Sequence, residues 1–214
     1  MIVEFIGAPC SGKTTISHEL VKTLKSKISV CESQYKISHG GWVKRVTYKF
    51  FLCLKYFITK PFYSFRLLRV IKKPKFFLYY LTLIASKDKF NVTIYEQGLG
   101  QFICSMFDEK PLKEEYVTYY FNELLPCKMD RILVYVKASC ESINKRIEKR
   151  NDKTLIYHKQ NSIERIIYVV DNIVDFWINR YGREKVYIVD NTEDKNLDDI
   201  LKKLSEKLIN DIKV

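Results

Sequence analysis

The residues with the clearest chemistry lie near the start of the chain. A short apolar run ends at Gly7, and a stretch with helical spacing of apolar residues begins near Lys13. Between them the sequence reads GAPCSGKT, which matches the phosphate-loop pattern G-x-x-x-x-G-K-[ST] at every position. The pattern predicts a P-loop, with a neighbouring threonine, formed by Gly7, Ala8, Pro9, Cys10, Ser11, Gly12, Lys13, Thr14 and Thr15.

Each residue type in this loop has a physical task. The two glycines let the chain curl so that successive N–H groups point toward a phosphate, and the helix N-terminus that follows favours an anion. We expect Lys13 to contact the β- and γ-phosphates and Thr14 to offer its hydroxyl to Mg²⁺. The sequence therefore predicts ATP and Mg²⁺ as ligands, while the loop itself does not distinguish adenine from guanine.

The rest of the chain alternates strand patterns with helical patterns. Strands are expected at 2–6, 28–31, 91–95, 131–136 and 185–189. Helices are expected from about 13, near 113–125, from about 139, at 161–180 and at 196–212. This alternation predicts a single α/β domain over residues 1–214, with a parallel sheet covered on both faces. Ligands of such sheets bind beyond the carboxyl ends of the strands, so functional residues are expected there.

Charged side chains do follow several of these strands. Glu32 follows the second strand and Glu96 the third, while Arg146 and Arg150 share one face of the helix after the fourth. Together with the P-loop, these motifs resemble the nucleoside and nucleotide kinases, thymidylate kinases especially. The resemblance implies a three-layer P-loop fold with a five-stranded sheet in the order 2-3-1-4-5, and a lid at about 146–160.

The resemblance also implies roles for these side chains. Glu32 would face the phosphate acceptor, and Glu96 would lie near Mg²⁺; either carboxylate could take the acceptor proton. Arg146 and Arg150 correspond to lid arginines that stabilise charge on the transferred phosphoryl group. Each of these side chains could instead be an ordinary solvated group. The family follows the acid of its third strand with arginine, whereas this chain has Gln97, so thymidylate is not carried over as the acceptor.

The net charge of +12 is concentrated in one segment. No acidic residue occurs between Glu32 and Asp88, where twelve Lys and Arg are interleaved with aromatic residues. Proline residues divide this segment into expected helices at 42–59, 62–71 and 75–88. We therefore expect a basic, aromatic helical insert at about 36–90. Three interpretations fit it: an acceptor-binding subdomain, attachment to an anionic membrane surface or lipid-linked substrate, and nucleic-acid binding, which no recognised motif supports.

These observations predict an ATP-dependent phosphotransferase. Its acceptor would be a small molecule such as a nucleoside, nucleotide or sugar derivative, and the basic insert favours an anionic one. The alternative is a nucleotide-dependent switch or regulatory ATPase at an anionic membrane surface. The guanine-specificity pattern N-K-x-D is absent, because the run beginning at Asn144 continues to Ile147 without the final acid.

Cysteine usage bears on the cellular compartment. The six cysteines form no C-x-x-C pair, and no secretory signal precedes the first strand, which together favour a reduced, cytoplasmic protein. A peripheral position at the membrane is the alternative that the basic insert leaves open. The sequence also leaves the oligomeric state open, a homodimer included.

Overall fold

The computed structural model describes residues 1–32, 91–104, 131–150, 160–192 and 197–213. The chain divides into two compact units, one formed by Met1–Glu32 with Phe90–Val214 and the other by Ser33–Lys89. Every described element belongs to the first unit. The segments predicted from the sequence that lie outside the described residues are the helical insert with its three helices, the helix near 113–125, and lid residues 151–159.

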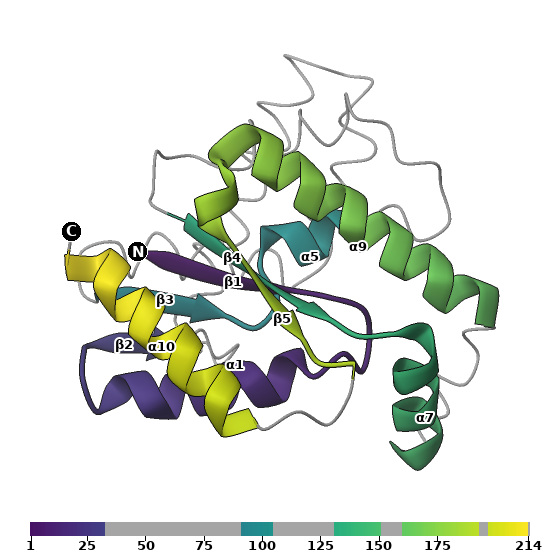
Figure 1. The fold of residues 1–214 in the computed structure, drawn as a ribbon, viewed down its shortest axis with the longest axis horizontal. Coiled ribbons are helices and arrows are strands. Elements are labelled where there is room, and N and C mark those ends of the chain that lie inside the picture. Colours follow the sequence, from purple (N-terminus) through teal and green to yellow (C-terminus); the bar gives the residue numbers. More distant parts are fainter. Residues whose placement is uncertain (33–90, 105–130, 151–159, 193–196, 214) are drawn as a thin grey trace, which may run out of the picture. The chain divides into compact units, whose positions relative to one another are not determined.

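A five-stranded parallel sheet forms the centre of the first unit (Figure 1). Its strands are β1 (Ile2–Ile6), β2 (Val30–Glu32), β3 (Val92–Tyr95), β4 (Arg131–Lys137) and β5 (Val186–Asp190). They lie in the order β2-β3-β1-β4-β5, and every neighbouring pair is parallel. This confirms the fold class and the strand order expected from the sequence. All residues of β1 are buried, as is typical of a central strand covered on both faces.

Helices cover both faces of the sheet. They are α1 (Lys13–Lys25), α5 (Leu99–Cys104), α7 (Cys140–Arg150), α9 (Gln160–Tyr181) and α10 (Leu197–Lys213), with a 3-10 turn, η2 (Arg183–Lys185), before β5. Figure 1 shows α1 and α10 along one face and α5 and α9 along the other. No pattern in the sequence predicted α5. No helix in the described part of the chain combines the length and apolar composition needed to cross a membrane.

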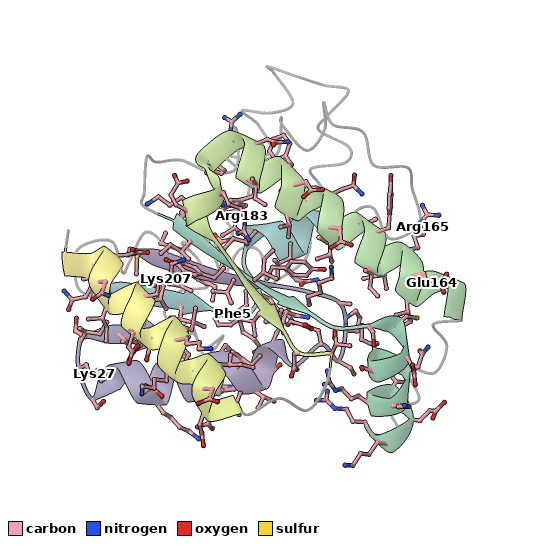
Figure 2. All side chains as sticks on the ribbon, in the orientation of Figure 1. Phe5, Lys27, Glu164, Arg165, Arg183 and Lys207 are labelled. Atoms are coloured by element: carbon pink, nitrogen blue, oxygen red, sulfur yellow. The ribbon has the colours of Figure 1, made fainter. Side chains whose placement is uncertain are left out.

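Alternating strand residues build the core between these layers. Val3 and Phe5 of β1 pack with Leu20 of α1 and Leu208 of α10, and all four side chains are fully buried. Burial of one such side chain stabilises the fold by roughly 1.5–3 kcal/mol. In Figure 2 Phe5 lies within the sheet layer, whereas the charged side chains of Lys27, Glu164 and Arg165 lie on the outside. The described unit is therefore an apolar sandwich with a charged exterior.

One charged pair lies inside this sandwich. The Arg131 guanidinium of β4 donates to Glu4 Oε1 of β1 at 2.7 Å, and both side chains are buried. Gly98, which follows β3, packs directly on Glu4: a Cβ atom at position 98 would lie 2.3 Å from Glu4 Oε2. A larger residue at position 98 would collide with Glu4, so glycine allows the segment after Glu96 to pack against β1.

Candidate functional site

The P-loop joins the carboxyl end of β1 to the start of α1. Gly12 has a φ of 102°, in the left-handed region that favours glycine, and Cys10 has a φ of 57°. A Cβ atom at Gly12 would lie 2.4 Å from Asn191 Nδ2, and one at Gly7 would lie 2.5 Å from the carbonyl oxygen of Val136. Both glycines of the motif are thus required by conformation or by space.

Lys13 begins α1 and folds back over the loop. Its Nζ donates to the carbonyl oxygens of Gly7 and Ala8 at 2.8 and 2.7 Å. The side chain is buried, and this burial lowers the pKa of the ammonium group to about 8, because the charged form loses its water. An ammonium group held this way gains from a nearby anion, so a phosphate group would favour its charged form.

Thr14 and Glu96 meet at the same edge of the sheet. The Thr14 hydroxyl, in the first turn of α1, donates to Glu96 Oε1 at 2.5 Å, just beyond the end of β3. A hydroxyl and a carboxylate are hard oxygen ligands of the kind that Mg²⁺ accepts alongside phosphate oxygens and water. Within the described ranges, no three His, Cys, Asp or Glu side chains cluster to hold a metal by themselves. The donor set therefore fits a Mg²⁺ ion shared with a bound phosphate.

Arg146 and Arg150 both reach the P-loop from α7. Arg146 Nη2 donates to the Asn191 carbonyl at 2.8 Å, and its Nη1 lies 3.4 and 3.5 Å from the carbonyl oxygens of Cys10 and Ser11. Arg150 is exposed, and its Nη1 lies 3.7 Å from Cys10 Sγ. The structure thus brings both predicted arginines to the loop, one against its main chain and one at its surface.

Glu32 lies in a different set of contacts. Its Oε1 is 2.7 Å from His18 Nδ1 on α1, and its Oε2 is 4.0 Å from Lys25 Nζ. In the register of the sheet Glu32 stands beside Ile94, two positions before Glu96. The structure therefore places the two predicted carboxylates in separate pairs, Glu96 with the P-loop helix start and Glu32 with the middle of α1.

Two side chains that sequence reasoning did not select also contact the P-loop. Gln101 of α5 accepts a hydrogen bond from the Gly7 N–H at 3.1 Å, and Asn191 Nδ2 donates to the Ser11 carbonyl at 2.7 Å. Asn191 follows β5 directly, so its position at a strand end was the available signal. Gln101 carried no comparable signal, because its helix was not expected.

Comparison with known proteins supports the fold. No protein-family model and no curated protein matches the sequence. Among solved structures, deoxyadenosine kinase from M. mycoides with bound dATP is 18% identical with a TM-score of 0.61, over 97% of this chain and 99% of that chain. The same enzyme with dCMP and a flexible dCDP bound is 16% identical with a TM-score of 0.61, over 98% and 100%.

The fold is similar to that of deoxyadenosine kinase. This confirms, at the level of the fold, the resemblance to nucleoside and nucleotide kinases on which the sequence interpretation relied. The similarity extends over nearly the full length of both chains. At these identities it concerns the path of the chain, so the roles of individual residues rest on the contacts described above.

Proposed function

We propose that this chain is an ATP- and magnesium-dependent kinase that transfers a phosphoryl group to a small acceptor. The observation that carries the proposal is the meeting of Lys13 and the Thr14–Glu96 pair at the carboxyl edge of the sheet. The same edge holds an arginine at the loop surface, Arg150. Phosphoryl transfer depends mainly on positioning and on stabilising charge, and these groups supply both.

The P-loop and the two cations would act on the donor. Main-chain N–H groups of the loop and the N-terminus of α1 bind the phosphates. Lys13 exchanges the carbonyls of Gly7 and Ala8 for phosphate oxygens, and Arg150 extends from α7 to the transferred group. Thr14 and Glu96 would hold a magnesium ion, which would neutralise part of the phosphate charge. Fixed cations aimed at developing charge lower the free energy of the transition state.

Glu32 and Glu96 contact different side chains, so we assign them different roles. Glu96 is joined to Thr14, so we assign it to the metal. Glu32 is joined to His18 instead, so we assign it to the acceptor, whose hydroxyl it would orient and deprotonate. Nucleosides and deoxynucleosides are the first acceptors to test, because both structures named above are of a deoxyadenosine kinase. Phosphorylated acceptors come next, because residues 33–87 carry no acidic side chain.

The test is ADP release from ATP–Mg²⁺ by the purified chain. Nucleosides, deoxynucleosides, their monophosphates and sugars are each added separately, and the product is identified by mass. We expect one class to accelerate ADP release and to gain a phosphoryl group. The Lys13→Ala variant should lose this activity, whereas Lys22→Ala, which alters an exposed lysine on the same helix, should retain it. Hydrolysis at one rate with and without every acceptor would point to the nucleotide-dependent switch instead.

A further inference from the structure

The outer side of the P-loop is bound by two side chains from the far half of the chain. Asn191 and Arg146 both contact main-chain carbonyls of the loop. We propose that Asn191 and Arg146 are positioning residues for the donor, which hold the Ser11–Gly12 peptide so that its N–H faces the phosphate. This inference rests on the proposed function, because it concerns the same donor site.

Asn191 is held in place by its own main chain. β4 and β5 pair as far as Lys137 and Asp190, and the Asn191 N–H continues this ladder by donating to the Lys137 carbonyl at 2.8 Å. Its side chain then reaches the Ser11 carbonyl at 2.7 Å. A Cβ atom at residue 12 would lie only 2.4 Å from Asn191 Nδ2. The position of the Asn191 amide therefore requires glycine at residue 12.

Arg146 is held by the start and the inner face of α7. Ser139 Oγ accepts the Ser142 N–H at 3.1 Å, and the Ser142 hydroxyl donates to the Thr192 carbonyl. These contacts tie the helix start to the segment after β5. Ile143 and Ile147, on the same helix as Arg146, are buried and hold α7 against the rest of the unit. The guanidinium consequently meets the carbonyl of Asn191 as well as the P-loop.

Peptide geometry links these outer contacts to the inner face of the loop. The Ser11 carbonyl and the Gly12 N–H belong to one planar peptide and point in opposite directions. Holding the carbonyl outward therefore directs the N–H inward, and a neighbouring guanidinium polarises the peptide in the same sense. The preceding peptide is fixed differently, since the Ser11 N–H donates to the Ala8 carbonyl at 3.2 Å. A positive φ such as that of Cys10 persists only where its surroundings determine it, and Arg146 contacts the carbonyl of Cys10.

These contacts separate the two arginines of α7. The half-buried guanidinium of Arg146 spans three carbonyl oxygens, so its donors are directed at the main chain. Arg150 is exposed beside the loop surface. We therefore assign charge stabilisation on the transferred group to Lys13 and Arg150, and the positioning of the loop to Arg146 with Asn191.

The experiment compares two variants with two matched controls. Asn191→Ala is paired with Asn172→Ala, whose Nδ2 likewise donates to a main-chain carbonyl at 2.7 Å, but on α9. Arg146→Ala is paired with Arg183→Ala, whose Nη1 donates to the Val186 carbonyl at 2.7 Å. Titration calorimetry measures dissociation constants for Mg–ATP, inorganic tripolyphosphate and adenosine, and thermal unfolding measures Tm.

We expect each site variant to raise the dissociation constants for Mg–ATP and tripolyphosphate by a common factor of about tenfold, as for loss of a hydrogen bond that holds the loop. Adenosine binding should stay unchanged, and the controls should bind all three ligands as the unaltered chain does. If Arg146→Ala does not fold, Arg146→Lys provides the same test, since it keeps the charge but loses the planar fork of donors.

Two results would overturn the inference. One is unchanged tripolyphosphate affinity in the site variants, whatever their loss of Tm, which would mean that the contacts do not position the loop for phosphate. The other is an equal loss of adenosine affinity, which would show that the two residues act on nucleoside binding rather than on the phosphates alone. Failure of the unaltered chain to bind any triphosphate would instead remove the proposed function itself.

Discussion

The proposed donor side and the proposed acceptor side of this site are built by different means. On the donor side, the P-loop is surrounded by contacts to its main chain, from Gln101 at Gly7 to Asn191 and Arg146 at Ser11. On the proposed acceptor side, Glu32 at the end of β2 lies beside His18 and Lys25 of α1, whereas Glu96 beyond β3 contacts Thr14 on the proposed metal side. Main-chain binding of phosphate is encoded by a short motif, whereas the proposed acceptor site would depend on side chains from separate segments.

Removing the cation of the donor side should have the largest effect. We expect Lys13→Met to lower kcat by about 10³-fold, because a fixed charge facing the transferred group is lost. Steady-state kinetics with the best acceptor measures this, and calorimetry should show that acceptor binding is retained. The exposed Lys22→Met serves as the control. A comparable loss of acceptor affinity in Lys13→Met would mean that the two sides are not separable.

The roles proposed for the two carboxylates are tested by exchanging them one at a time. We expect Glu32→Gln to lower kcat by about 10²-fold, as for loss of a general base, with an unchanged dissociation constant for Mg–ATP. Glu96→Gln should instead raise the magnesium concentration needed for half-maximal rate, because Glu96 shares the metal side with Thr14. Magnesium titrations of both variants decide the assignment. The opposite pattern would make Glu96 the base.

The pH dependence of donor binding gives the smallest effect. Burial lowers the pKa of Lys13 to about 8, so above that pH the free protein carries mostly neutral Lys13. Bound phosphates favour the charged form, so binding takes up a proton and affinity falls as pH rises through the pKa. Between about pH 8 and pH 9 the dissociation constant should rise about fivefold. Calorimetry near the pKa, in buffers of different ionisation enthalpy, measures the proton uptake.

Lys13→Arg is the control for this linkage, because arginine stays charged throughout this range. Its affinity for Mg–ATP should be lower overall but flat with pH, and its binding heat should not depend on the buffer. Equal pH dependence in both proteins would assign the titration to another group. The contrast therefore isolates one ammonium group on the donor side.

The sequence predicted the strand and helix on either side of the P-loop well because their signals are local. The apolar run of β1, the phosphate motif and the start of α1 are contiguous, and their bounds match the structure. The second strand was placed at 28–31, whereas β2 begins at Val30, since a short edge strand has little pattern of its own. The helix α5 was not predicted because its six residues span less than two helical turns, which is too short for helical spacing to show.

Partners that meet through the fold were harder to predict. Glu96 was expected near the metal because it follows a strand and because the resemblance implied that role. Its metal role stays a prediction, while its carboxylate accepts a hydrogen bond from Thr14. The Asn191–Ser11 contact joins residues 180 positions apart in sequence, and the His18–Glu32 pair joins α1 to the end of β2. Helical spacing predicted that Arg146 and Arg150 share one face of a helix. It could not predict that Arg146 would contact main-chain carbonyl oxygens of the P-loop. Such contacts follow from strand order and register, which no single segment contains.

The parallel pairing of β2 with β3 limits how the chain could be shortened. Because the two strands are parallel, the chain leaves β2 at its carboxyl end, Glu32, and must return to the amino ends of the strands before β3 begins. There Asn91 accepts hydrogen bonds from Ser29 and from the amino group of Met1. A parallel crossover needs roughly a dozen residues or more, usually with a helix. Deletion variants that join Glu32 to Asn91 through a tight turn should therefore lose the edge strand, together with the carboxylate it carries.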